Sequence, residues 1–426
     1  MLKTKPTVGD TSWFTHDRFG LFIHWGLYAL PARHEWVKHQ EQIPNEVYDA
    51  KYFTRFDPDL YDPEAWAAAA AGAGMKYFVI TTKHHEGFCL WDTQLTDYKA
   101  PNTPCGRDLI KPMAEAFRDA GLHVGLYHSL IDWHHPHYLL DPHIGPYRSH
   151  PDREKLNEGR DQAKYAKYLH GQVRELLTGY GKVDVIFYDF SYPKPDGSGK
   201  GRKDWESEKL LKLTRKLQPG IIVNDRLDLG DVEGGWDIKT PEQFLPREWV
   251  RVNGEPVVWE TCQTFSGSWG YHRDEATWKS VDMLVRMLIE VVSRGGNLLL
   301  NVGPTGRGEF DERALDRLAG MGEWMRRHGR AIYGCTQAPE ELPRPHDCRL
   351  TYNPETNRVY VHVFAWPFRH LHLDGFAGRV DYAQLLNDAS EIKFREAPDD
   401  PRKTLTLELP VVKPSVAVPV VELYLR

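Results

Sequence analysis

Reactive side chains follow the apolar runs of this sequence, at the carboxyl end of each run. In KYFVITTKHHEGFCLWDT an apolar run leads into Lys83, the adjacent histidines His84 and His85, and Glu86. The run VDVIFYDF leads in the same way to Asp189. Carboxylates and imidazoles held on rigid backbone can transfer protons, attack an electrophilic carbon or bind a hydroxyl-rich ligand. For any one of these residues the alternative is a buried polar group that its neighbours satisfy.

Seven apolar runs share this feature, and a purely structural explanation does not account for the whole set. The polar groups at their ends are His24-Trp25, Lys83 to Glu86, Tyr127-His128, Tyr188-Asp189, Asn224 to Arg226, Trp259-Glu260 and Asn301. In barrel enzymes the carboxyl ends of the strands meet at one rim, where the active site lies. The pattern therefore predicts a single pocket that collects residues from distant parts of the chain.

Several chemistries that depend on recognisable motifs find little support. His84 and His85 are adjacent, so within a strand they would face opposite sides, unlike the HxH pair of a barrel metal site. The motifs HExxH and GxSxG and a P-loop do not occur in the sequence. We therefore expect no metal and no other cofactor, and a metal-dependent hydrolase is kept only as a competing hypothesis.

Paired carboxylates remain, and they are the groups with which most glycosidases work. Asp189 closes an apolar run and is the candidate nucleophile. Glu260 lies at a predicted strand end and Glu242 in a predicted rim loop, so both qualify as the acid/base, with Glu86 as a third option. The content of 14 Trp, 20 Tyr and 20 His fits either a large aromatic core or a cleft that binds sugars.

Strands and helices alternate along most of the chain. The apolar runs predict strands at 19–25, 76–85, 123–130, 183–190, 220–226, 256–262 and 296–304. Helical patterns fall between them at 63–74, 108–121, 158–178, 205–217, 275–293 and 311–328. Continuously apolar strands joined by helices predict an α/β fold, most simply a (β/α)8-like (TIM-type) barrel. A doubly wound sheet is the second choice, but no GxGxxG follows the first strand.

The pattern changes near residue 340. RLTYNPETNRVYVHVFAW alternates polar and apolar residues around an Asn-Pro turn, as a β-hairpin does. HLHLDGF, TLTLELP and VVELYLR continue in the same style. We therefore predict a catalytic barrel over residues 1–340 and a small antiparallel β-sandwich over residues 341–426.

Composition and charge narrow the choice of partners. A net charge of −6 offers no basic surface for nucleic acid, and no apolar run is long enough to span a membrane. The N-terminus MLKTKPTVGDTSWF lacks the apolar core of a signal peptide, and five scattered cysteines without a CxxC indicate reduced thiols. These features predict a cytoplasmic enzyme of bacterial type that binds neither nucleic acid nor membrane. A homo-oligomer is compatible with them.

Six blocks of the sequence, in this order, resemble the α-L-fucosidases of glycoside hydrolase family 29. They are FGLFIHWGLYALPARHEW, KYFVITTKHHEGFCLWDT, VGLYHSLIDWHHP, NDR, WETCQTFSGSWGY and GGNLLLNVGPTGRGEF, spread over residues 13–335. The resemblance is specific because the blocks occur together. It implies a barrel followed by a β-sandwich, and a retaining exo-glycosidase that removes terminal α-L-fucose through a covalent glycosyl-enzyme. The implied substrate is a fucosylated glycan or glycoside.

The same resemblance implies roles for individual residues. Asp189 would be the nucleophile and Glu242 the acid/base, with Glu260 as the second choice. The residues implied to bind the fucose ring are His24, Glu35, Trp36, His84, His85, Tyr127, Arg226 and Trp269. Trp269 is expected near the C5 methyl group, which distinguishes fucose from galactose.

Three residues depart from the family pattern. Phe190 follows the nucleophile where glycine is common, Glu86 replaces an aspartate after the two histidines, and Val37 replaces an aromatic residue. We expect Phe190 to narrow the leaving-group side of the site. A glycosidase for a galactose-like pyranoside and a catalytically inactive carbohydrate-binding barrel remain alternative functions.

Overall fold

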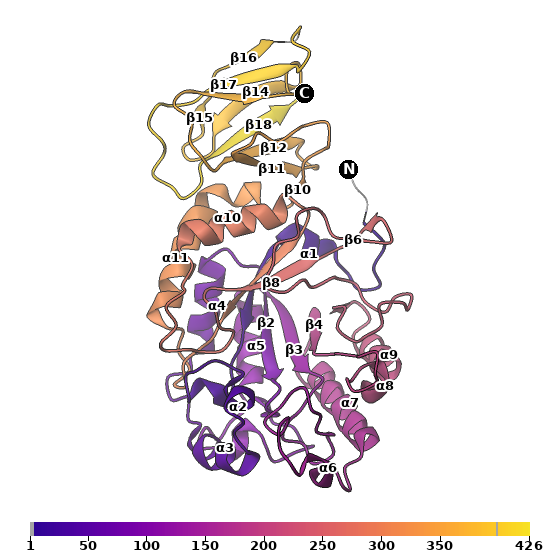
Figure 1. The fold of residues 1–426 in the computed structure, drawn as a ribbon. Coiled ribbons are helices and arrows are strands. Elements are labelled where there is room, and N and C mark those ends of the chain that lie inside the picture. Colours follow the sequence, from indigo (N-terminus) through magenta and orange to yellow (C-terminus); the bar gives the residue numbers. More distant parts are fainter. Residues whose placement is uncertain (1–3, 398) are drawn as a thin grey trace.

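The chain forms a barrel of strands and helices followed by antiparallel sheets. A computed structural model describes residues 4–397 and 399–426. Figure 1 shows the barrel below and the C-terminal sheets above, with α10 (Val281–Val292) and α11 (Glu312–His328) running near the junction. The signal-peptide prediction concerns in part residues 1–3, which lie outside the described residues.

Seven parallel strands build the barrel. They are β1 (Phe19–Ile23), β2 (Tyr77–Lys83), β3 (His123–Ser129), β4 (Val185–Asp189), β5 (Ile222–Val223), β8 (Glu260–Thr264) and β9 (Asn297–Val302). Their order in the sheet is β5-β4-β3-β2-β1-β9-β8. The predicted fold class is confirmed, and six of the strands fall inside their predicted ranges.

The sixth predicted strand is shifted toward the C-terminus. It was expected to end at residue 262 with Trp259-Glu260 near its end, but β8 begins at Glu260. The cause is a short hairpin, in which β7 (Glu255–Pro256) pairs with β6 (Arg251–Val252). Residues at the start of the apolar run are therefore already paired elsewhere, and the expectation that Glu260 ends a strand is wrong.

Residues 238–242 lie between the two edge strands of the sheet, β5 and β8. Isolated parallel bridges join Asn224 to Ile238, Lys239 to Trp259 and Glu242 to Cys262. This segment takes the place that an eighth strand has in a complete barrel. Glu242, expected in a free rim loop, is consequently attached to the barrel wall through its backbone.

One face of each strand points into the barrel and is apolar. The inner cluster contains Phe22, Tyr77, Val79, Tyr127, Val185, Phe187, Ile222, Ile238, Val258, Cys262 and Leu299. Side chains two residues apart on a strand share a face, so Phe22 leads to His24 and Phe187 leads to Asp189. The apolar interior therefore continues directly into polar groups at the carboxyl rim, which is how the barrel positions its site.

Helices accompany the strands in the predicted alternation, and all six predicted helices are present. The remaining helices are α1 (Ser12–Asp17), α2 (Val37–Gln40), α3 (Asn45–Lys51), α4 (Pro63–Gly72), α5 (Ile110–Asp119), α6 (Arg153–Leu156), α7 (Gln162–Gly179), α8 (Arg202–Trp205) and α9 (Ser207–Leu217). α10 begins later than predicted because the Ser280 hydroxyl caps it by accepting from the Met283 N–H. Within the described ranges, no helix is long and apolar enough to cross a membrane.

The C-terminal residues form two antiparallel sheets around their own apolar core. One has the order β10-β11-β12-β18-β14-β15 and the other β13-β17-β16. The bounds are β10 (Thr336–Gln337), β11 (Cys348–Asn353), β12 (Arg358–Val363), β13 (His370–Leu373), β14 (Val380–Leu385), β15 (Ser390–Glu391), β16 (Phe394–Ala397), β17 (Thr404–Glu408) and β18 (Val420–Leu425). The predicted hairpin is confirmed as β11 and β12. The domain division at residue 341 stays a prediction, and β10 already precedes it.

Candidate active site

A narrow pocket of about 50 Å³ opens where the barrel strands end. Its lining consists of Phe22, His24, Trp36, His84, His85, Tyr127, Phe187, Asp189, Phe190, Arg226, Glu242, Cys262 and Trp269. Every site residue expected from the sequence lies in this lining except Glu35, Glu260 and the third acid/base option, Glu86. Residues more than 200 positions apart in the chain therefore meet in one small cavity.

Asp189 is the last residue of β4, and its carboxylate is held from two sides. The Tyr127 hydroxyl donates a hydrogen bond to Oδ2 at 2.7 Å, and Arg226 donates one to Oδ1 at 2.8 Å. Tyr127 comes from the neighbouring strand β3, which pairs with β4 in parallel. Asp189 is 9% exposed. One bond to each oxygen fixes the orientation of a carboxylate that the solvent still reaches.

Arg226 joins Asp189 to the second carboxylate of the pocket. The same Nη1 that contacts Asp189 lies 2.8 Å from Oε2 of Glu242, and Nε and Nη2 donate to the hydroxyl and carbonyl of Thr240. Burial lowers the pKa of Arg226, but the two carboxylates raise it more, so the guanidinium pKa lies above its usual range. Arg226 is therefore a permanent positive charge between two acids.

The shared nitrogen limits the distance between the two carboxylates. Because each oxygen lies 2.8 Å from it, the oxygens are separated by at most twice that distance, about 5.6 Å. Retaining glycosidases place their two carboxyl groups roughly 5–5.5 Å apart, and inverting ones roughly 6.5–9.5 Å apart. This upper limit for the nearest oxygens is compatible with the retaining geometry.

Glu242 is the more exposed of the two acids, with 43% of its side chain accessible. Its backbone is nevertheless fixed, because Gln243 N–H donates to the Cys262 carbonyl of β8 at 3.1 Å. A carboxyl group on fixed backbone with its tip in water can exchange protons with solvent between catalytic steps.

His24 has a defined tautomer. The Asn301 amide nitrogen donates to the Trp269 carbonyl at 2.6 Å, so its oxygen faces the imidazole. His24 Nδ1–H therefore donates to that oxygen at 2.6 Å, and Nε2 is left with a lone pair. Burial lowers the pKa of His24 to about 3, which keeps the ring neutral.

His85 is oriented by the same logic. The Ser129 hydroxyl donates to the Ile131 carbonyl at 2.7 Å, so it accepts from His85 Nδ1–H at 2.7 Å. His85 Nε2 then carries a lone pair 3.8 Å from Oδ2 of Asp189. Burial lowers the pKa of His85 well below its ordinary value. The lone pair of His85 Nε2 and the nearby Asp189 oxygen are both acceptors, so they suit a ligand that donates from a hydroxyl group.

His84 completes the group of neutral imidazoles. Its Nδ1 is buried and finds no hydrogen-bond partner within residues 4–397 and 399–426. Burial lowers the pKa of His84 as well. A buried polar atom without a partner is costly unless a ligand supplies one. No group of three or more His, Cys, Asp or Glu side chains in the described part of the chain is arranged to hold a metal ion.

Trp269 and Glu35 act as a pair. The Trp269 ring lies 5.1 Å from His24 and 5.9 Å from Phe22, centroid to centroid. Glu35 lies behind this wall, where Oε2 accepts from Trp269 N–H at 3.1 Å and Gly270 N–H at 2.7 Å. Burial raises the pKa of Glu35. In this structure Glu35 holds the segment that carries Trp269 and does not line the cavity.

Glu260 lies away from the pocket. As the first residue of β8 it is buried near the amino ends of the strands, and its Oε2 accepts from the Tyr77 hydroxyl at 2.5 Å. Tyr77 begins β2 in the same way. Burial raises the pKa of Glu260 to about 8. Glu260 was considered as the acid/base because it was expected at the carboxyl end of a strand, and the structure does not place it there.

Glu86, the third option for the acid/base, also lies outside the pocket. It is buried, and it accepts hydrogen bonds from Leu27 N–H at 3.0 Å and from the Tyr48 hydroxyl. Burial raises its pKa to about 7. Through Leu27 it connects the segments that follow β1 and β2.

The sequence-based list missed several lining residues. Phe22 and Phe187 each stand two positions before a predicted site residue on the same strand, so alternation along the strand indicates them. Phe190 was noted as a departure without being assigned to the site, and Cys262 carried no signal of its own. The supporting residue Ser129 becomes identifiable only once neighbouring strands are placed side by side, whereas Asn301 already stands among the polar residues at the predicted strand ends.

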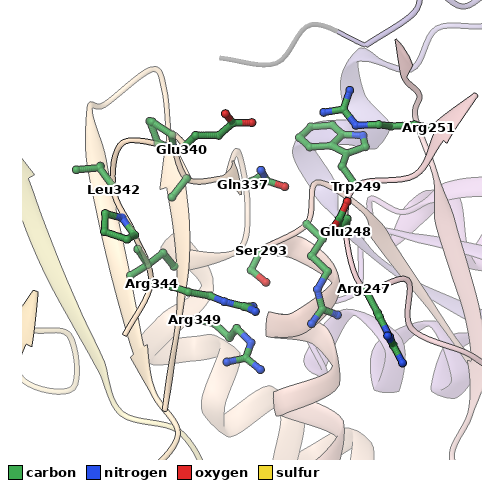
Figure 2. A pocket seen from close by; sticks show the side chains of 15 residues that line it. Arg247, Glu248, Trp249, Arg251, Ser293, Gln337, Glu340, Leu342, Arg344 and Arg349 are labelled. Atoms are coloured by element: carbon green, nitrogen blue, oxygen red, sulfur yellow. The ribbon is translucent and has the colours of Figure 1, made fainter. Parts of the chain in front are cut away.

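A wider cleft of about 460 Å³ lies between the barrel and the β-sandwich (Figure 2). Figure 2 shows Trp249 and Arg251 on one wall and Arg344 on the other. Arg349 of β11 pairs with Glu290 of α10 at 2.6 Å, and Arg294 pairs with the same carboxylate. These ion pairs connect the sandwich to the barrel. None of the described residues lines both cavities.

Known proteins are similar to this chain in both sequence and fold. The sequence model of the family described as Alpha-L-fucosidase matches residues 4–330. The tissue alpha-L-fucosidase of Macaca fascicularis is 30% identical over 437 residues, covering 96% of this chain and 86% of that protein. The plasma alpha-L-fucosidase of Homo sapiens is 30% identical over 387 residues, covering 84% of this chain and 76% of that protein.

Solved structures extend this similarity to three dimensions. Alpha-L-fucosidase isoenzyme 1 from Paenibacillus thiaminolyticus superposes with a TM-score of 0.91 at 44% identity, over 98% of each chain. A family 29 alpha-L-fucosidase from Bacteroides thetaiotaomicron superposes with a TM-score of 0.84 at 27% identity, over 100% of this chain and 98% of that one. That structure is described as a trapped covalent intermediate in complex with 2-fluoro-fucosyl fluoride.

Proposed function

Because the chain belongs to the α-L-fucosidase family, glycoside hydrolase family 29, we propose that Asp189 and Glu242 are the two catalytic carboxylates of a retaining α-L-fucosidase. The resemblance of the six sequence blocks is thereby confirmed. The observation that carries the assignment of residues is the Nη1 of Arg226, which lies 2.8 Å from an oxygen of each acid. The substrate is a terminal α-L-fucoside of a glycan or a smaller glycoside.

In the first step Asp189 attacks C1 of the bound fucose. The C1–O bond to the leaving group breaks, and Glu242, in its acid form, gives its proton to the departing oxygen. A covalent bond between C1 and the Asp189 carboxylate remains. The hydrogen bonds from Tyr127 and Arg226 orient the carboxylate before it attacks, so little reorganisation is needed at the moment of reaction.

In the second step water replaces Asp189 at C1. Glu242, now ionised, takes a proton from the water, the new C1–O bond forms, and the bond to Asp189 breaks. Two displacements on opposite faces restore the original configuration. Tyr127 and Arg226 stabilise the carboxylate as it leaves, because both donors already point at its oxygens.

The remaining residues of the pocket bind the sugar. The lone pairs on Nε2 of His24 and His85 accept hydrogen bonds from fucose hydroxyls, and the unpartnered His84 adds a third neutral imidazole. Phe22 and Trp269 provide an apolar surface for the methyl group at C5. Such a contact discriminates fucose from a hydroxymethyl sugar by about 1–3 kcal/mol.

An activity assay tests this assignment directly. The protein is expected to hydrolyse an aryl α-L-fucoside, with α-L-fucose as the first product seen by NMR before mutarotation. Aryl β-galactoside serves as the comparison, because it shares hydroxyl orientations but lacks the methyl group. Preference for the galactoside would change the substrate and keep the mechanism. Initial release of the β-anomer of fucose would contradict retention.

A further inference from the structure

Phe190, the residue after the proposed nucleophile, has a backbone conformation that phenylalanine rarely adopts. Its φ angle is +79°, in the left-handed region that favours glycine. A strained residue persists only where its surroundings hold it, and such residues cluster at functional sites. Glycine would satisfy this backbone without strain, so the chain retains a large side chain where the backbone disfavours one.

The Phe190 ring belongs to an aromatic wall of the catalytic pocket. Its centroid lies 4.9 Å from the ring of His85, 5.4 Å from that of Trp36 and 5.5 Å from that of Tyr192. Trp36 also contacts His85, at 5.1 Å. These packed rings hold Phe190 in its strained conformation and set its side chain beside Asp189.

The wall is anchored from behind. The hydroxyl of Tyr192 donates to Oδ2 of Asp141 at 2.5 Å, and the Lys200 ammonium group donates to the same oxygen at 2.8 Å. The side chains of Asp141 and Lys200 are each 6% exposed. A nearly buried ion pair therefore anchors the Tyr192 ring that packs against Phe190.

Burial places this wall at the mouth of the pocket. Phe22, Tyr127 and Phe187 in the lining are at most 2% exposed, whereas Trp36 and Phe190 are half-buried. The lining leaves a cavity of only about 50 Å³ beside the proposed nucleophile. Whatever is attached to the bound sugar must pass the more exposed residues of the lining, and Phe190 is the aromatic residue among them that follows Asp189 directly in the chain.

Resting on the proposed function, we propose that Phe190 determines which leaving groups this enzyme accepts. The ring offers a flat apolar face to an aryl group or to the C–H face of a sugar. It also occupies the space that a branched saccharide would need beside C1. The enzyme therefore favours flat, unbranched leaving groups and discriminates against fucose attached at a branch point.

The test compares kcat/KM for an aryl α-L-fucoside and for a branched fucosylated oligosaccharide. Phe190→Gly and Phe190→Ala are expected to raise the ratio of oligosaccharide to aryl fucoside at least 5-fold, and Phe190→Tyr is expected to keep the wild-type ratio. Active enzyme is counted in each sample by titration with 2-fluoro-fucosyl fluoride, so misfolded protein does not distort the ratio.

The two small substitutions separate the ring from the strain. Both remove the ring, but only glycine relieves the backbone, so Phe190→Gly should unfold roughly 1–3 °C above Phe190→Ala. A ratio that stays unchanged while kcat falls equally for both substrates would overturn the proposal and leave Phe190 as a support for Asp189. Wild-type protein inactive on all α-L-fucosides would instead refute the proposed function itself.

Discussion

The candidate catalytic pocket is much smaller than the cleft between the barrel and the sandwich, yet its polar groups are more closely organised. The pocket holds about 50 Å³ and the cleft about 460 Å³. In the pocket, two acids share one arginine and three neutral imidazoles face the cavity or its nearest groups. In the cleft, Arg294 and Arg349 are already paired with Glu290, and Arg247, Arg251 and Arg344 are exposed to solvent. Convergent, oriented polar groups identify a site better than volume does.

The origin of the two cavities explains this contrast. Parallel strands deliver their terminal residues to one rim, so their side chains converge on one point. The cleft forms where the sandwich meets the barrel, and its lining comes from segments of both parts (Figure 2). Among these described residues, no common strand geometry directs the side chains to one point. Substitutions in the two cavities should therefore have very different consequences.

The largest effect is expected for Asp189→Asn. The change keeps the shape of the side chain but removes the nucleophile, so kcat for an aryl α-L-fucoside should fall by about 10⁴-fold or more. Azide added to Asp189→Gly should restore turnover and give the β-fucosyl azide, because azide attacks from the face that the carboxylate occupied. Residual activity above a hundredth of wild type would contradict the role of Asp189.

The next largest effect is expected for Glu242→Ala. Loss of the proton donor should lower kcat by roughly 10²–10⁴-fold for an unactivated fucoside and less for an aryl fucoside with an acidic leaving group. Azide should restore activity and yield the α-fucosyl azide, since it enters after the glycosyl-enzyme has formed. Glu248→Ala, the same change at an exposed residue of the cleft, is the matched control. Equal losses in both variants would remove the distinction between the cavities.

Acid should destabilise the folded protein between pH 7 and pH 5. Histidines whose pKa is lowered by burial stay neutral when folded but gain protons when unfolded, so stability falls as the pH drops below about 6.5. These include His24, His84, His85, His128 and His362. With a folded pKa of about 3, His24 alone should contribute a loss of roughly 2 kcal/mol at pH 5.

Buried glutamates oppose this trend without reversing it. The pKa values of Glu86 and Glu260 are raised to about 7 and about 8. Lowering the pH from 7 to 5 therefore increases the free energy of unfolding by roughly 2 kcal/mol for each of them. Histidines with lowered pKa outnumber the glutamates with raised pKa, so the net change is a loss. The midpoint of guanidinium unfolding at pH 5 and pH 7 measures it. A higher midpoint at pH 5 would show that the glutamates dominate.

The smallest effect is expected for Arg344→Gln in the cleft. The side chain is exposed and has no ion pair in the described part of the chain, so kcat/KM should stay within about 2-fold of wild type and the unfolding midpoint nearly unchanged. Steady-state kinetics and a thermal scan are sufficient. A 10-fold loss of activity would mean that the cleft takes part in catalysis after all.

Much of this architecture can be predicted from local sequence pattern. Buried parallel strands are apolar over their whole length, so runs such as YFVITT and VIFYD are recognisable without any partner. The polar residues that end them converge because of barrel geometry, and for this reason Asp189 and His84 could be assigned to one pocket.

Other features depend on contacts that are distant in the chain. Residues 238–242 lie in the stretch DIKTPEQ, which contains no apolar run. Their place in the barrel depends on backbone bridges to Asn224, Trp259 and Cys262, which the local sequence does not indicate. In the sequence Glu260 follows an apolar run, as a residue at the carboxyl end of a strand would. In the structure the β6–β7 hairpin precedes a shifted strand, so Glu260 lies at the amino end of β8. The direction in which Glu35 points is likewise set by Gly270, far along the chain.

The most direct test of the central claim is covalent labelling by 2-fluoro-fucosyl fluoride. The protein is incubated with the reagent, digested, and the modified peptide is sequenced by tandem mass spectrometry, with Asp189→Asn treated in parallel. The account predicts one fluorofucosyl group per chain on Asp189, in the peptide that contains VIFYDF, and none on the variant. A label on Glu242, Glu260 or any other residue would contradict it.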